Sequence, residues 1–197
     1  MIEKKRISKS KMIKENFNKQ LYMVLAITFS VIVNDKIIYP IWSRLGYERN
    51  IIIKIVFTTI VAFTMYAALN IVINKDKTEL YIDVFMILYI LFIISITFFK
   101  AKLSHHSFVL NPFASIIDIK SSPIDGTVNI FGNFLMYIPI GSYIKSKLNF
   151  NRNRMITYFV IYITCVEITQ AITKTGTCDM NDIIMNTLGF IIGLIIL

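Results

Sequence analysis

The run IIIKIVFTTIVAFTMYAALNIVI, residues 51–73, carries a single charged side chain, that of Lys54. A helix needs roughly 20 mostly apolar residues to cross a bilayer, so this run is long enough to span one. Similar runs lie on both sides of it, and the predicted helices cover residues 19–36, 51–73, 80–100, 128–145, 155–173 and 181–197. The sequence therefore predicts an all-α fold, a polytopic membrane bundle of about six transmembrane helices.

The composition agrees with this fold class. Hydrophobic residues make up 55% of the 197 residues, and the mean hydropathy is +0.63. Charged residues reach only 17%, against about 25% in soluble domains. No polar stretch is long enough to form a large soluble domain. The basic N-terminal tail and the apolar run after it resemble a signal sequence, but no small-residue cleavage site follows, which favours a retained first helix.

The formal net charge of +9 has two interpretations, a nucleic-acid partner or the basic flanks of membrane helices. Lys and Arg cluster beside the apolar runs, with no basic domain interleaved with aromatic residues, so the second interpretation is preferred and no nucleic-acid partner is expected. Cys165 lies in an apolar run and Cys178 in a short connection, and neither belongs to a CxxC pair. A disulfide or a zinc site is therefore not predicted.

The basic residues also predict the orientation. Most of the 21 Lys and Arg residues fall on one side of the membrane if the N-terminus is cytoplasmic. Cytoplasmic loops are enriched in these residues. We therefore expect a multi-pass membrane protein with both termini in the cytoplasm. The long connection over residues 101–127 would then lie outside, together with the start of 128–145, the end of 155–173 and the start of 181–197.

Polar residues recur at helical spacing on these three outer ends. Residues three or four apart share one helix face, and ionisable groups at membrane depth usually face a bundle interior or a wet cavity. Glu167 is the deepest acid, roughly 9 Å inside its helix end at 1.5 Å per residue. We predict one outward-facing polar cluster, formed by Asn129, Asn133, Glu167, Gln170, Asp179, Asp182 and Asn186.

Structural roles compete with this interpretation for most members of the cluster. The asparagines Asn129, Asn133 and Asn186 could serve only as hydrogen-bonding contacts between helices. Asp179 or Asp182 could be an N-cap of the last helix, where a negative charge also complements the helix dipole. Glu167 has no such structural explanation in the sequence and is the candidate catalytic residue, should the protein be an enzyme.

Other motifs have mainly structural interpretations. Gly189 and Gly193 form a GxxxG pattern, which favours close helix packing, and Pro139 with Gly141 predicts a kink or an end in the fourth helix. His105 and His106 could ligate a metal, but adjacent histidines without spaced carboxylates favour a solvated loop. No Walker loop, Rossmann fingerprint or HExxH motif is present. No metal site and no cofactor are predicted.

Four motifs in order resemble the VanZ-like membrane family. They are LNPF (110–113), NIFGNFLMYIPIG (129–141), EITQ (167–170) and GTCDMNDIIMNTLG (176–189). The resemblance runs from about Tyr81 to Leu197, with Tyr137 where relatives usually carry Phe. It implies a VanZ-like domain of four transmembrane helices over residues 80–197. Residues 1–79 would then be a basic tail with two additional transmembrane helices.

The resemblance implies a context, a protein of the bacterial plasma membrane, rather than a reaction. Some members of that family are linked to reduced sensitivity to teicoplanin-type lipoglycopeptides. The first hypothesis is a membrane factor that alters how envelope lipids or lipid-linked wall precursors meet such antibiotics. The alternative is a membrane-embedded enzyme acting on a lipid head group, with Glu167 as acid/base. A small transporter is a third hypothesis, weakened by the lack of an internal repeat. The expected partners are the bilayer and its lipids.

Overall fold

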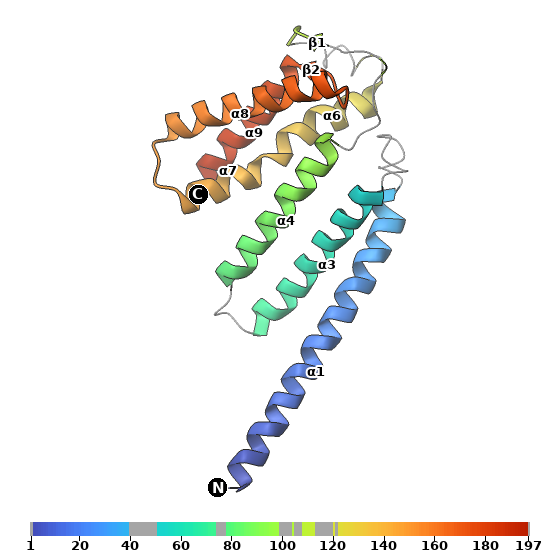
Figure 1. Cartoon of the computed structure of the whole chain (residues 1–197), viewed down its shortest axis with the longest axis vertical. Coiled ribbons are helices and arrows are strands. Elements are labelled where there is room, and N and C mark those ends of the chain that lie inside the picture. The colour runs from blue at the N-terminus through green and yellow to red at the C-terminus, as the bar shows by residue number, and fades with distance from the viewer. Residues whose placement is uncertain are drawn as a thin grey trace. The chain divides into compact units, whose positions relative to one another are not determined.

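The structure, a computed structural model, describes residues 2–39, 51–73, 78–98, 104, 108–112, 120 and 122–196. It is dominated by helices, as predicted from the apolar runs (Figure 1). Four of the described helices are long and apolar enough to cross a membrane, over Phe17–Ile37, Ile51–Ile71, Thr78–Phe98 and Arg152–Thr173. Met180–Ile196 is a further apolar helix of shorter length. The all-α class is confirmed, while the number of spans stays a prediction.

The chain forms two compact units, Met1–Ile96 (unit 1) and Thr97–Leu197 (unit 2). Unit 1 contains α1 (Ile2–Val33), the π-helical turn η1 (Asn34–Ile38), α3 (Ile51–Ile73) and most of α4 (Thr78–Phe98). Helix α1 packs along α3. Helix α3 meets α4 through aromatic pairs, with the ring centroids of Phe57 and Phe92 5.6 Å apart. The predicted domain boundary at residues 79/80 stays a prediction.

Unit 2 contains the remaining helices. These are α6 (Pro123–Met136), α7 (Ile138–Lys147), α8 (Arg152–Thr173) and α9 (Met180–Ile196). The predicted helix over 128–145 is two helices, broken at Tyr137 as Pro139 led us to expect, with Pro139 in the first turn of α7. Helix α6 already begins at Pro123, because proline is well suited to a first helical turn.

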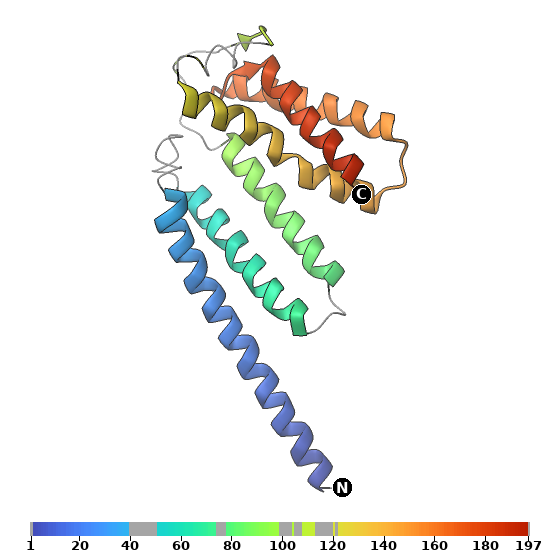
Figure 2. The same cartoon turned by 180° about the vertical axis from the view of Figure 1, so that it is seen from behind.

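Helix α9 is the centre of unit 2, since α6, α7 and α8 all pack against it (Figure 2). Glycines make this packing very close. A Cβ on Gly189 would lie 1.9 Å from the Phe134 carbonyl oxygen, and one on Gly193 would lie 2.2 Å from that of Ile138. The predicted close-packing role of the GxxxG pattern is confirmed. Phe134 of α6 lies at Gly189, and Ile138, at the start of α7, lies at Gly193, further along α9. Helices α6 and α7 therefore run parallel to α9.

Aromatic stacking fills the space between α8 and α9. The rings of Phe159 and Phe190 stack with centroids 4.1 Å apart, and Tyr137 meets Phe159 edge-on at 5.1 Å. Every fourth residue of α8 is buried, and this stripe consists of Met155, Phe159, Ile163, Glu167 and Ala171. Four of its five members are apolar, so the side chain of Glu167 occupies a position that the helix otherwise fills with hydrocarbon.

Candidate functional site

A tight turn joins α8 to α9 and shapes the candidate site. Helix α8 ends at Thr173, and Lys174 follows in the left-handed conformation with φ 60°. The Gln170 carbonyl accepts hydrogen bonds from the backbone N–H groups of Thr175 at 3.0 Å and Gly176 at 3.4 Å. This pattern of bonds back to the last helical turn is how many helices end. The chain is thereby reversed and returns toward Glu167.

Glu167 is the buried acid of the site, with 3% of its surface exposed. Among the described residues, its carboxylate accepts one hydrogen bond, from the Asp179 N–H to Oε2 at a long 3.4 Å. The charged form of a buried carboxylate is costly unless donors or cations surround it. A bond of this length compensates little of that cost, so Glu167 retains capacity to accept further donors.

Asp179 caps the last helix. Its Oδ1 accepts a hydrogen bond from the Asn181 N–H at 2.8 Å, two residues along the chain, at the start of α9. The prediction that one of the two aspartates is an N-cap is therefore confirmed for Asp179. The same residue offers its own N–H to Glu167, so one short segment links the acid on α8 to the first turn of α9.

Two short strands add a segment that the sequence did not predict at this site. Strand β1 (Phe108–Val109) pairs in parallel with β2 (Cys178–Asp179), with Phe108 opposite Cys178 and Val109 opposite Asp179. Residues 110–112 of the LNPF motif follow directly, while Phe113 lies outside the described residues. Two-residue strands have almost no periodicity, which is why no alternating pattern could have indicated them.

The amides of α6 and α9 differ in their surroundings. Asn186 is 4% exposed, and its Oδ1 is buried without a hydrogen-bond partner among the described residues. Asn133 is half-buried, and its Nδ2 likewise lies buried without such a partner. Asn129 is exposed. It lies one turn further from the crossing of α6 with Gly189, so the same helix face is covered at Asn133 and open at Asn129.

Gln170 is engaged on another side of α8. Its Nε2 donates a hydrogen bond to the Thr97 carbonyl at 3.0 Å, and its side chain packs against Gly176. A Cβ on Gly176 would lie 2.9 Å from Nε2. Glu167 and Gln170 lie three residues apart on α8, but their side chains contact different neighbours, Asp179 and Thr97. Asp182, in the first turn of α9, is half-buried.

Asn181 is the buried polar residue that the predicted cluster left out. It is 1% exposed and is among the largest fully buried side chains of the described chain. Its place between Asp179 and Asp182 was visible in the sequence, but helical spacing from Asn186 does not put it on the same face. Thr175 in the preceding turn is also buried. Neither position carries a sequence signal beyond its polar type.

The described residues contain no group of three or more His, Cys, Asp or Glu side chains arranged to hold a metal ion. His105 and His106 lie outside the described residues. What the structure brings to one end of unit 2 is the carboxylate of Glu167, the capping Asp179, and the start of α9 with its buried asparagines. This set can accept and donate hydrogen bonds and can exchange a proton.

The VanZ/LLP1 family matches this chain over residues 85–197. The chain belongs to that family. The resemblance predicted from the four ordered motifs is confirmed, and the matched region contains the polar end of unit 2. Helices α1 and α3 precede the matched region. Comparison with curated proteins and with solved structures gave no match. Family membership and the apolar helices together support a multi-pass VanZ-like membrane protein.

Proposed function

We propose that this protein acts in the bacterial plasma membrane, where the polar end of unit 2 opens to the outer face and binds the head group of an envelope lipid or a lipid-linked wall precursor. With a lipid bound there, the protein would change how those lipids interact with lipophilic glycopeptides such as teicoplanin. The termini would lie in the cytoplasm. The proposal rests on family membership and on one feature of the site, the buried Glu167.

The observation that supports binding is the position of the Glu167 carboxylate. It is 3% exposed within the candidate span Arg152–Thr173, yet it accepts only a long bond from Asp179 among the described residues. Intramembrane acids are expensive and usually line a pathway or a binding site. A head group rich in hydroxyl, amine or amide donors would supply what this carboxylate lacks. Asn186 Oδ1, also buried without a described partner, would accept from the same donors.

A second candidate function is an enzyme acting on a lipid head group. The observation that favours it is the hydrogen bond from the Asp179 N–H to Glu167, which brings a second acidic residue next to the buried acid. A buried carboxyl group beside another acid is suited to transfer a proton. In this role Glu167 would be the acid/base and Asp179 would position the substrate.

One experiment separates these functions. The full chain would be placed in nanodiscs with a fluorescent envelope lipid or lipid-linked wall precursor, as wild type and as Glu167→Gln. Glu79→Gln is the matched control, because Glu79 is an exposed glutamate in the first turn of α4. We expect binding that weakens in Glu167→Gln and persists in Glu79→Gln. Cells carrying the same variants would show whether teicoplanin sensitivity follows binding.

The remaining outcomes decide against this proposal. Conversion of the lipid that is lost in Glu167→Gln would establish the enzyme instead. Transbilayer movement without conversion would establish a transporter. Equal lipid binding by Glu167→Gln and Glu79→Gln would show that Glu167 does not contribute to the binding site.

The outward orientation has its own test, in a chain with Cys165 and Cys178 changed to Ser. Met180→Cys suits this test because Met180 is exposed at the start of α9, whereas Asn181 is fully buried. An impermeant maleimide applied to intact cells should label Met180→Cys and leave Lys147→Cys, at the other end of unit 2, unlabelled. The reverse pattern would place the polar end in the cytoplasm and contradict the proposed function.

A further inference from the structure

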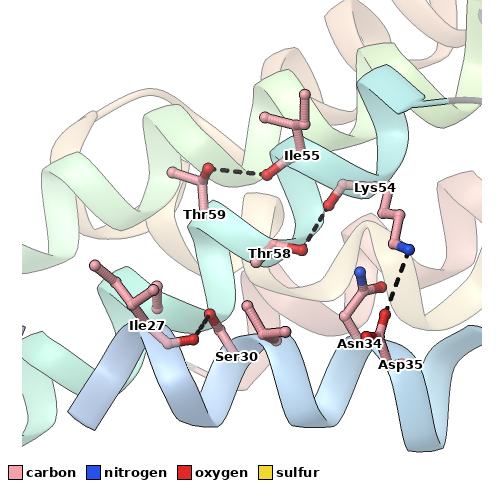
Figure 3. A pocket seen from close by; sticks show the side chains of 10 residues that line it. Ile27, Ser30, Asn34, Asp35, Lys54, Ile55, Thr58 and Thr59 are labelled. Carbon is pink, nitrogen blue, oxygen red and sulfur yellow. Dashed lines mark hydrogen bonds and ion pairs between the residues drawn. The ribbon is translucent and has the colours of Figure 1, made fainter. Parts of the chain in front are cut away.

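A groove of about 550 Å³ runs between α1–η1 and α3 in unit 1 (Figure 3). This volume is in the range of small-molecule and cofactor sites. One wall comes from α1 and η1, between Ile27 and Asp35, and the other from α3, between Lys54 and Ala62, each contributing residues at helical spacing. All of these residues precede the region matched by the VanZ/LLP1 family.

The groove is charged at one end and apolar at the other. Lys54 Nζ lies 3.3 Å from Asp35 Oδ1, and both side chains are about half exposed. The Tyr39 ring lies under the same ammonium, 5.9 Å away. Ile27 and Ala62 lie eight residues along their helices from this pair, roughly 12 Å at 1.5 Å per residue. A molecule lying along the groove would therefore contact charged side chains at one end and apolar side chains at the other.

The backbone widens where the charged end begins. Residues Asn34–Ile38 form a π-helical turn that interrupts the regular helix. Such turns are rare and frequently occur at functional sites, because the extra residue per turn redirects side chains. Here Asn34 lies in the groove beside Asp35 and faces α3 (Figure 3). The π turn thus places an amide next to the ion pair.

Asn34 lacks the hydrogen-bond donor that its position demands. It is 2% exposed, and its Oδ1 is buried without a hydrogen-bond partner among the described residues. The nearby hydroxyl groups donate elsewhere: Ser30 to the Ile27 carbonyl at 2.8 Å and Thr58 to the Lys54 carbonyl at 2.7 Å. An unsatisfied buried acceptor is costly. A ligand with an N–H donor at this depth would remove that cost.

We propose that this groove binds a glycerophospholipid with a primary ammonium head group, of the phosphatidylethanolamine class. The ammonium donates to Asn34 Oδ1 and lies beside the Asp35 carboxylate. The phosphate lies at Lys54 Nζ, which has three donor hydrogens. An acyl chain follows the apolar wall toward Ala62. The inference concerns unit 1 and does not depend on the function proposed for unit 2.

The chemistry of the head group distinguishes this lipid from its neighbours in a bilayer. Phosphatidylcholine has the same charges but no N–H group, so it leaves Asn34 Oδ1 unsatisfied. Phosphatidylglycerol offers hydroxyl donors but no cation for Asp35. A helix of a second copy would bring only side-chain donors, because its backbone N–H groups are bonded within the helix.

The test measures lipid retention by the purified full chain. Protein in mixed micelles with equal amounts of phosphatidylethanolamine and phosphatidylcholine would be analysed by native mass spectrometry. A hydrogen bond to a charged donor predicts a preference of about tenfold for phosphatidylethanolamine. Asn34→Leu should abolish the preference. Asn70→Leu is the matched control, because Asn70 is a buried asparagine of α3 whose Nδ2 donates to the Tyr66 carbonyl at 2.8 Å, outside the groove.

Two further variants keep the test decisive if Asn34→Leu misfolds. Lys54→Gln should weaken retention of both lipids, because each carries a phosphate. Ala62→Phe should do the same by filling the apolar end. Equal retention of the two lipids by the wild type would overturn the proposal. So would an Ala62→Phe variant that keeps its lipid but changes the oligomeric mass, since the groove would then hold a second copy of the chain.

Discussion

The two units pack their helices in different ways. In unit 2, glycines let α9 approach α6 and α7 until backbone meets backbone, as Gly189 meets the Phe134 carbonyl. In unit 1, α1 and α3 face each other across Thr, Ser and charged side chains, and a groove remains between them. Lipid tails are as apolar as leucine, so helix association in membranes depends on close contact and on polar groups. Unit 2 is packed through close glycine contacts, whereas unit 1 buries apolar side chains such as Ala26 and Ile53 and leaves a partly polar groove beside them.

The largest expected effect follows from inserting a methyl group at the close contact. Gly189→Ala should lower the free energy of unfolding by about 3 kcal/mol or more, because the Cβ would overlap the Phe134 carbonyl group and the two backbones must separate. Thermal unfolding in detergent measures this. Gly132→Ala on α6 is the matched control, since a Cβ there meets nothing within 4 Å. Equal behaviour of the two variants would contradict the backbone contact of α6 with α9.

The second prediction concerns the thiol at the polar end of unit 2. Burial raises the pKa of Cys178, and the nearby carboxylates of Glu167 and Asp179 raise this pKa further. Only the thiolate reacts with maleimide, so labelling in a Cys165→Ser background should be slow at neutral pH and should accelerate as the pH rises.

Glu167→Gln removes one of these negative charges, so the pKa of Cys178 should fall and labelling at a fixed pH should become severalfold faster. Glu79→Gln should leave the rate unchanged. A rate that responds to neither variant would place Glu167 too far from the thiol to influence it. The unfolded chain, labelled in denaturant, gives the reference rate.

The third prediction concerns the turn after α8. Lys174 adopts φ 60°, a conformation that glycine enters without steric cost. Lys174→Gly should therefore raise the free energy of unfolding by about 1 kcal/mol. Lys147→Gly, in the last turn of α7, should lower it by a similar amount, because glycine there only loosens a helix. Thermal unfolding of both variants measures the difference, and a destabilised Lys174→Gly would contradict the helix-end geometry.

The smallest expected effect is in unit 1. Asp35→Asn should change the free energy of unfolding by less than about 1 kcal/mol, because the ion pair with Lys54 is about half exposed at both side chains. A double-mutant cycle with Lys54→Gln measures the coupling. A much larger coupling would mean that the bilayer desolvates the pair. The ion pair would then contribute substantially to the packing of α1 against α3.

The helices could be predicted because apolar run length is a strong signal, and each predicted run corresponds to a helix or to the pair α6–α7. The break at Tyr137 followed from Pro139, and the close packing at Gly189 followed from the GxxxG spacing. The pairing of β1 with β2 could not be predicted, because it joins two-residue segments about 70 positions apart through backbone atoms alone.

The candidate site was predictable in its chain positions and less so in its contacts. Their spacing placed Glu167 and Gln170 on one helix face, but only the fold shows that Glu167 contacts Asp179 while Gln170 contacts Thr97. Helical spacing defines a face and leaves the partner open. Asn34 likewise carries no sequence signal of its role, although the fold makes it the buried acceptor of a groove.

The central place of α9 has a consequence for biosynthesis. Helices α6, α7 and α8 leave the ribosome before the helix that all three contact. Until α9 is inserted, Gly141 and the carbonyl groups of Phe134 and Ile138 lack the surface they pack against. The earlier helices therefore stay incompletely packed in the bilayer until α9 is inserted. Unit 2 can therefore complete its packing only after α9 has been inserted, whatever the order in which the earlier helices enter the bilayer.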